Sequence, residues 1–139
     1  MATVVKSTYV NVGLRYMIML RKPEIEVVAV DFDGTIATSG CYPTPGELIP
    51  ESREILLEFY KQGGRIIIWT CRTGHDLTLA LKFLQDNDVP FDAVNSNLEY
   101  RIRRWNGMDG RKVGADLYLD DKTPGFSWKK ARKAMFYTK

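Results

Sequence analysis

Residues 25–35 read IEVVAVDFDGT, a mostly apolar run followed by two aspartates and a Gly-Thr pair. The run over 25–30 is typical of a strand that is buried on both faces of a parallel sheet. Two carboxylates that lie two residues apart on an extended chain point the same way, so we expect Asp31 and Asp33 to share one site. Like charges at one site repel each other unless a cation or a proton neutralises them. The stretch therefore predicts a buried strand that ends at an acidic site.

The rest of the chain alternates apolar strand patterns with helical patterns, which is typical of α/β folds. Further strands are predicted over 65–69, 91–94 and 116–120, and helices over 52–61, 76–85 and 127–136. We therefore expect an α/β, three-layer Rossmann-like fold with a mainly parallel sheet. Residues 25–139 are predicted to form a single catalytic domain, and residues 1–24 a short leader or edge element.

Composition limits the class of protein. The chain has 139 residues, of which 45% are hydrophobic and 27% charged, as in ordinary globular domains. One histidine and two cysteines argue against a structural zinc site. The apolar stretch over 16–20 is far shorter than the ~20 residues of a membrane-spanning helix. We expect a cytoplasmic protein without a membrane partner.

Charge is distributed unevenly along the chain. Residues 1–99 hold 9 Lys and Arg against 13 Asp and Glu, whereas residues 100–139 hold 11 against 4. This basic segment would attract an anionic partner, such as a nucleic-acid end. The alternative is a solvated helix face together with a loop.

Polar residues follow the other predicted strands, at the sheet edge where open α/β folds bind ligands. Thr70-Cys71-Arg72 follows the second strand and offers hydroxyl, guanidinium and backbone N–H groups for a phosphate. Asp120-Asp121 ends the fourth strand, and Lys112 lies upstream of it. Asn95 and Asn97 follow the third strand, and we interpret them as ordinary turn residues, with contact to the substrate as the alternative.

In this order, Asp31-Phe32-Asp33-Gly34-Thr35, Thr70, Lys112 and Asp120-Asp121 resemble the four motifs of the haloacid dehalogenase-like (HAD) superfamily of phosphohydrolases. The resemblance implies that Asp31 attacks phosphorus and forms an aspartyl-phosphate, while Asp33 acts as general acid and base. It implies that Thr70 and Lys112 neutralise the phosphoryl oxygens. Gly34, Thr35, Cys71 and Arg72 are the candidate substrate-binding residues.

The same resemblance implies a Mg²⁺ cofactor. Its ligands would be the Asp31 carboxylate, the Asp33 backbone carbonyl and a carboxylate of the last acidic pair. Asp121 aligns better with the metal-binding position than Asp120 does, and the choice between them stays open. The expected activity is Mg²⁺-dependent hydrolysis of a phosphomonoester, and the presence of Asp33 favours a phosphatase over a dehalogenase.

Superfamily members with a cap domain insert it after the first motif or after the third strand. Residues 37–49 and 95–111 are too short for a domain, so we expect a capless protein with a short flap at 37–49. The substrate would then be a small phosphorylated molecule or a macromolecular end, and a second subunit could cover the open site. Two alternatives are a non-catalytic phospho-acceptor or phosphate-binding module, and a polynucleotide-end phosphatase.

Overall fold

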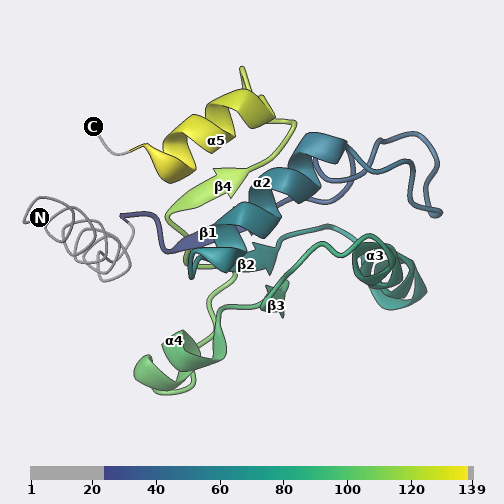
Figure 1. The fold of residues 1–139 in the computed structure, drawn as a ribbon. Coiled ribbons are helices and arrows are strands. Elements are labelled where there is room, and N and C mark those ends of the chain that lie inside the picture. Colours follow the sequence, from purple (N-terminus) through teal and green to yellow (C-terminus); the bar gives the residue numbers. More distant parts are fainter. Residues whose placement is uncertain (1–23, 138–139) are drawn as a thin grey trace, which may run out of the picture.

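The computed structural model describes residues 24–137, in which strands and helices alternate along the chain (Figure 1). The elements are β1 (Val27–Val30), α2 (Pro50–Lys61), β2 (Arg65–Ile68), α3 (Gly74–Asp86), β3 (Ala93–Val94), α4 (Glu99–Arg104), β4 (Leu117–Leu119) and α5 (Trp128–Phe136). The leader or edge element predicted for residues 1–24 lies, apart from Glu24, outside the described residues.

The four strands form one parallel sheet in the order β3-β2-β1-β4. Val30, the last residue of β1, is in register with Ile68 on one side and with Leu119 on the other. Ile68 is in turn in register with Val94. All four strands therefore end at the same level, and the residues that follow them leave the sheet along a single edge. The predicted α/β fold with a mainly parallel sheet is confirmed.

Alternation along β1 and β2 separates two apolar cores. Val28, Val30, Ile66 and Ile68 belong to the larger core, which α2, α3 and α5 cover with side chains such as Leu56, Leu84 and Met135. Val27, Ala29 and Ile67 face the opposite way and pack with Leu98 and Val113. The sheet is thus buried on both faces, as its continuous apolar strands require.

Local sequence explains where the helices begin and end. Pro50 occupies the first turn of α2, where its missing N–H costs nothing, and Gly63-Gly64 follow its last turn. A Cβ at Gly64 would lie 2.3 Å from the ring of Phe59, so this position requires glycine. The Ser127 hydroxyl accepts a hydrogen bond from the backbone N–H of Lys130 and caps α5 as predicted.

One helix and the bounds of two strands differ from the sequence predictions. Helix α4 was not predicted, because its six residues lie in the basic segment after β3. Strand β4 is one residue shorter at each end than expected; the backbone N–H of Asp116 still donates to the carbonyl of Val27, and its carboxylate accepts the N–H groups of Glu26 and Val27, all at 2.8 Å. β3 is likewise shorter than predicted; the backbone N–H of Asp92 donates to the carbonyl of Ile66, and its carboxylate accepts the N–H of Ile66, both at 2.8 Å.

The basic segment does not form one surface. Helix α4, which carries Arg101, Arg103 and Arg104, lies on the opposite side of the sheet from α5, which carries the basic residues of 129–133 (Figure 1). Arg103 pairs with Glu99 and Arg132 pairs with Glu58. The charge imbalance of residues 100–139 is therefore divided between two faces, which weakens the case for a single polyanion-binding lobe.

Neither expected insertion point carries a second domain in the described part of the chain. Residues 37–48 form a flap whose base is an antiparallel bridge between Ala37 and Leu48. Residues 95–111 contain the short helix α4. Across residues 24–137, no helix has the length and apolar character to cross a bilayer.

Helix α5 is tied directly to the turn after β1, because the buried indole N–H of Trp128 donates to the carbonyl of Thr35 at 2.9 Å. Trp128→Phe keeps an aromatic ring but leaves this buried carbonyl without its donor, so the free energy of unfolding should fall by about 1–3 kcal/mol. Denaturant unfolding measures the change. Tyr137→Phe, at a 68% exposed ring, is the control and should leave stability unchanged. Equal stability of Trp128→Phe and the parent protein would contradict this role.

Candidate active site

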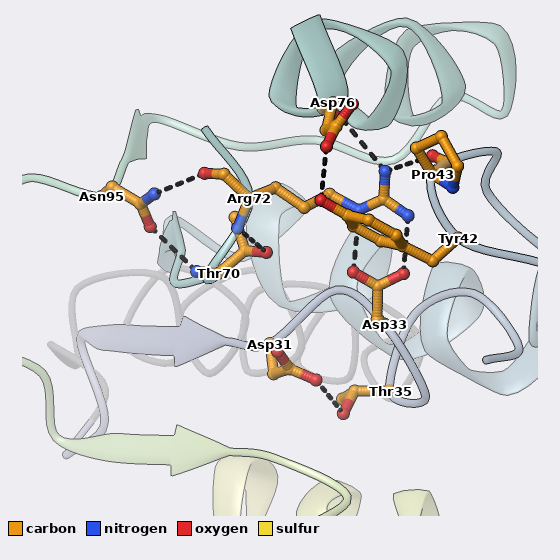
Figure 2. Close-up of polar contacts among 9 residues, drawn as sticks. All are labelled: Asp31, Asp33, Thr35, Tyr42, Pro43, Thr70, Arg72, Asp76 and Asn95. Atoms are coloured by element: carbon orange, nitrogen blue, oxygen red, sulfur yellow. Dashed lines mark hydrogen bonds and ion pairs between the residues drawn. The ribbon is translucent and has the colours of Figure 1, made fainter. Parts of the chain in front are cut away.

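The chain turns sharply directly after Asp31. The carbonyl of buried Phe32 accepts the N–H groups of Ile36 and Ala37 at 3.0 and 3.1 Å, which closes a helical turn. Because the chain is not extended here, Asp31 and Asp33 do not point the same way: Figure 2 shows Asp31 directed to Thr35, and Asp33 directed to Arg72. The two carboxylates therefore have different partners at the end of β1, and their action on one substrate stays a prediction.

The carboxylate of Asp31 belongs instead to an acidic triad with Asp120 and Asp121. Carboxylate oxygens of the three residues all lie within 4.8 Å of one another, and the three side chains are half-buried. The pKa of Asp31 is raised from 3.8 to about 7: burial is the largest cause, and the charges of Asp120 and Asp121 add to it, against the lowering effect of the Thr35 hydrogen bond. Lys122 lies 3.4 Å from Asp121 Oδ2 but its side chain is exposed, so one solvated cation faces three carboxylates.

Three carboxylates offer the hard oxygen ligands that Mg²⁺ prefers, and a divalent cation among them would remove their repulsion. The triad therefore fits the expected metal through Asp31, Asp120 and Asp121. Asp33 was expected to contribute its backbone carbonyl, and its carboxylate lies outside the triad.

Thr35 forms hydrogen bonds with two members of the triad. Its hydroxyl accepts the backbone N–H of Asp121 at 2.9 Å and lies 3.0 Å from Asp31 Oδ2 and 3.3 Å from Asp121 Oδ1. Thr35 is fully buried. Its position differs from the expected substrate-binding role, because the hydroxyl is used to join the ends of β1 and β4.

Gly34 makes room for the same carboxylate. Its φ of +86° lies in the left-handed region, and a Cβ there would lie 2.6 Å from Asp121 Oδ2. Gly34 is therefore required for the approach of Asp121 to the turn after β1. This is a different role from the substrate contact that the sequence predicted.

Arg72 is a buried arginine whose side chain is 1% exposed. Its Nε and Nη2 donate to the two oxygens of Asp33, both at 2.7 Å, and its Nη1 donates to the carbonyls of Pro43 and Asp76. Four of its five N–H groups are thus engaged by protein. The guanidinium was expected to meet a phosphate, and here it fixes Asp33, the flap and the start of α3 to one another.

Tyr42 lies over this arginine. The centre of the guanidinium is 4.9 Å from the Tyr42 ring centroid and 5.2 Å from that of Phe32. The Tyr42 hydroxyl donates to the carboxylate of Asp76 on the first turn of α3 (Figure 2). Sequence analysis missed both Tyr42 and Asp76, because contacts between a flap and a helix 34 residues later leave no signal in the local pattern.

Thr70 and Asn95 meet where β2 and β3 end. The side-chain carbonyl of Asn95 accepts the N–H of Thr70 at 2.8 Å, and its amide donates to the carbonyl of Arg72 at 3.4 Å (Figure 2). Asn95 has a φ of 49° and so is a turn residue, as interpreted from the sequence, but it also holds the turn that presents Thr70. Cys71, within this turn, is exposed.

Lys112 is directed toward the ring of Tyr118 and not toward the acidic triad. Its ammonium group lies 5.4 Å from the centroid of the Tyr118 ring, and across residues 24–137 no hydrogen bond or ion pair joins it to the acidic triad. The neighbouring Arg111 donates to the carbonyl of Asn95 at 3.3 Å and so lies beside the turn of Thr70. Arg111 is therefore a second candidate for the cation of this site, and the role of Lys112 stays a prediction.

Comparison with known proteins supports the fold. A solved structure described as a conserved protein from Bacteroides thetaiotaomicron is similar, with a TM-score of 0.68 and 30% identity over 84% of this chain and 100% of that one. A second structure, from Vibrio cholerae, has a TM-score of 0.44 and 24% identity over 50% of this chain and 68% of that one. No protein-family model matches the chain, and no curated protein matches it significantly.

The raised pKa of Asp31 predicts how stability depends on pH without a metal. The folded chain holds this proton more tightly than the unfolded chain between about pH 4 and pH 7, so the contribution of Asp31 to the free energy of unfolding falls as pH rises through that window. Asp31→Asn should therefore become more stable than the parent protein by about 2 kcal/mol at pH 8, allowing for solvent screening of a half-buried group. Denaturant unfolding in chelator at pH 4, 6 and 8 measures this difference.

Asp88→Asn, at an exposed residue with a φ of 52° that asparagine tolerates, is the control and should show no such trend. An Asp31→Asn difference that is constant from pH 4 to pH 8 would contradict the electrostatic account of the triad.

Proposed function

We propose that this chain, which belongs to the same family as the conserved Bacteroides thetaiotaomicron protein, hydrolyses phosphomonoesters through a phosphorylated Asp31 with the help of a divalent cation, Mg²⁺ by preference. The observation that carries the proposal is the convergence of Asp31, Asp120 and Asp121 within 4.8 Å at the end of β1 and β4. Resemblance of the motifs to the HAD superfamily supports the assignment of Asp31 as nucleophile.

Asp31 begins the reaction by attacking phosphorus, so that its oxygen–phosphorus bond forms as the bond to the leaving oxygen breaks. The cation would supply charge neutralisation, holding the carboxylate in its ionised form and screening the phosphoryl oxygens. Thr35 orients Asp31 through its 3.0 Å contact. Thr70 and a cation from the 111–112 pair would bind the phosphoryl oxygens.

Asp33 would give a proton to the leaving oxygen and then take one from the water that cleaves the aspartyl-phosphate. Both of its oxygens face Arg72 at 2.7 Å, so at least one must turn from the guanidinium to meet the substrate. Arg72 is thus a positioning residue for Asp33. Substrate binding would exchange part of this ion pair for a contact with the leaving group.

Kinetics on two esters test the separate tasks of the aspartates. Asp31→Asn should lower turnover of every ester at least ~10³-fold, because the variant lacks the carboxylate that attacks phosphorus. Asp33→Asn should slow the first step more for an alkyl phosphate, which releases a basic alkoxide, than for an aryl phosphate, which releases a stabilised phenolate. Rapid mixing with intact-mass detection of the added phosphoryl group measures both effects.

Asp88→Asn again serves as the control and should keep full activity. Substantial phosphatase activity in Asp31→Asn, or activity that survives exhaustive chelation of divalent cations, would contradict the proposal. A phosphorylated protein that never turns over would favour the alternative of a non-catalytic phospho-acceptor.

A further inference from the structure

Tyr42, in the flap, is exposed to solvent and also held in place by its neighbours. The residue is 64% exposed, yet the hydroxyl is held by Asp76 and one ring face is packed on the Arg72 guanidinium at 4.9 Å. Aromatic side chains have two side-chain torsions, so two such contacts fix the ring almost completely. The outer face of the ring is therefore open to solvent and held in one orientation before any ligand arrives.

The ring also lies beside the group that would meet the leaving oxygen. Arg72 links Tyr42 to Asp33 through contacts of 4.9 and 2.7 Å, and Figure 2 shows the ring lying across the Arg72–Asp33 pair. Asp31 lies on the other side of Asp33 from Tyr42 in the same view. In the proposed mechanism Asp33 protonates the leaving oxygen, so the leaving group of a phosphate on Asp31 would extend toward Asp33 and the neighbouring Tyr42.

A pre-ordered, exposed aromatic face is suited to stacking. Stacking of a base on an aromatic side chain is worth about 1–3 kcal/mol by substitution, and a ring that is already fixed loses little entropy on binding. Aliphatic leaving groups gain less from a flat aromatic surface. The position and exposure of Tyr42 therefore favour leaving groups that carry an aromatic ring over aliphatic leaving groups.

We propose that Tyr42 determines specificity by stacking on an aromatic ring carried by the leaving group, so that the preferred substrates are phosphomonoesters of nucleosides or of similar ring-bearing alcohols. This inference rests on the proposed phosphohydrolase function and names its substrate class. Arg72 supports the ring from beneath, and Asp76 fixes its outer end. Tyr42 contacts the leaving group and takes no part in the bond changes at phosphorus.

The test compares two substrates that release the same primary alkoxide and differ only in the base. These are adenosine 5′-monophosphate and the 5′-phosphate of 1-O-methylribofuranose, assayed with Mg²⁺. The parent protein should hydrolyse the nucleotide with a kcat/KM at least ~10-fold higher, as expected from stacking of one base. Tyr42→Leu should remove this preference by raising KM for the nucleotide, so that the ratio of the two kcat/KM values falls toward 1 whatever the variant does to the base-free ester.

Two variants separate stacking from a general effect on the flap. Tyr42→Phe loses the hydroxyl contact with Asp76 but keeps the ring, and should retain most of the preference. Tyr137→Leu removes a comparably exposed tyrosine, 68% exposed, at the end of α5 and should leave the preference unchanged.

Failure of the inference and failure of the proposed function give different results. Equal kcat/KM for the two substrates, or a Tyr42→Leu loss that is the same for both, overturns the role of Tyr42 while phosphatase activity stands. If neither substrate nor an aryl phosphate is hydrolysed with Mg²⁺, the proposed function fails and the substrate class fails with it.

Discussion

The parallel pairing of β1 with β2 and β4 is the constraint on which the candidate site depends. Because Val30, Ile68 and Leu119 are in register, the chain leaves all three strands at one level. Asp31, Thr70 and Asp120-Asp121 come from distant parts of the sequence and are brought to one edge by the strand pairing, with the Thr35 and Asn95 side chains joining the strand ends. β1 lies where the chain changes direction across the sheet, which is where open α/β folds bind ligands.

Asp31 and Asp33 lie in different electrostatic environments. Asp33 has its countercharge within the protein, since Arg72 binds both of its oxygens. Asp31 has no such partner among its described contacts and faces Asp120 and Asp121, which together with burial raises its pKa to about 7. One aspartate is thus neutralised by the fold, and the other is left for a cation. This division follows from the turn at Phe32, which sends the two carboxylates in different directions.

Much of this arrangement could be predicted from the sequence, and the exceptions have physical reasons. Apolar runs and helix stop signals predicted the strands and three long helices, because local burial and turn chemistry determine them. The direction of Asp33 could not be predicted, because an extended chain was assumed where Gly34 allows a turn. Burial of Arg72 was also missed, since an arginine is ordinarily exposed unless a partner far along the chain pairs with it. The sequence could not decide between Arg111 and Lys112, because only side-chain packing directs Arg111 to the carbonyl of Asn95 and Lys112 to the ring of Tyr118.

The central claim is that Asp31 is the carboxylate that accepts a phosphoryl group, with a cation held against the acidic triad. A crystal structure of the protein with Mg²⁺ and beryllium fluoride, which mimics a phosphoryl group on a carboxylate, tests this claim most directly. We expect beryllium bonded to the Asp31 carboxylate and Mg²⁺ coordinated by Asp31 and by Asp121 or Asp120. Beryllium fluoride on Asp33, or a triad that binds neither ion at saturating concentrations, would contradict the account.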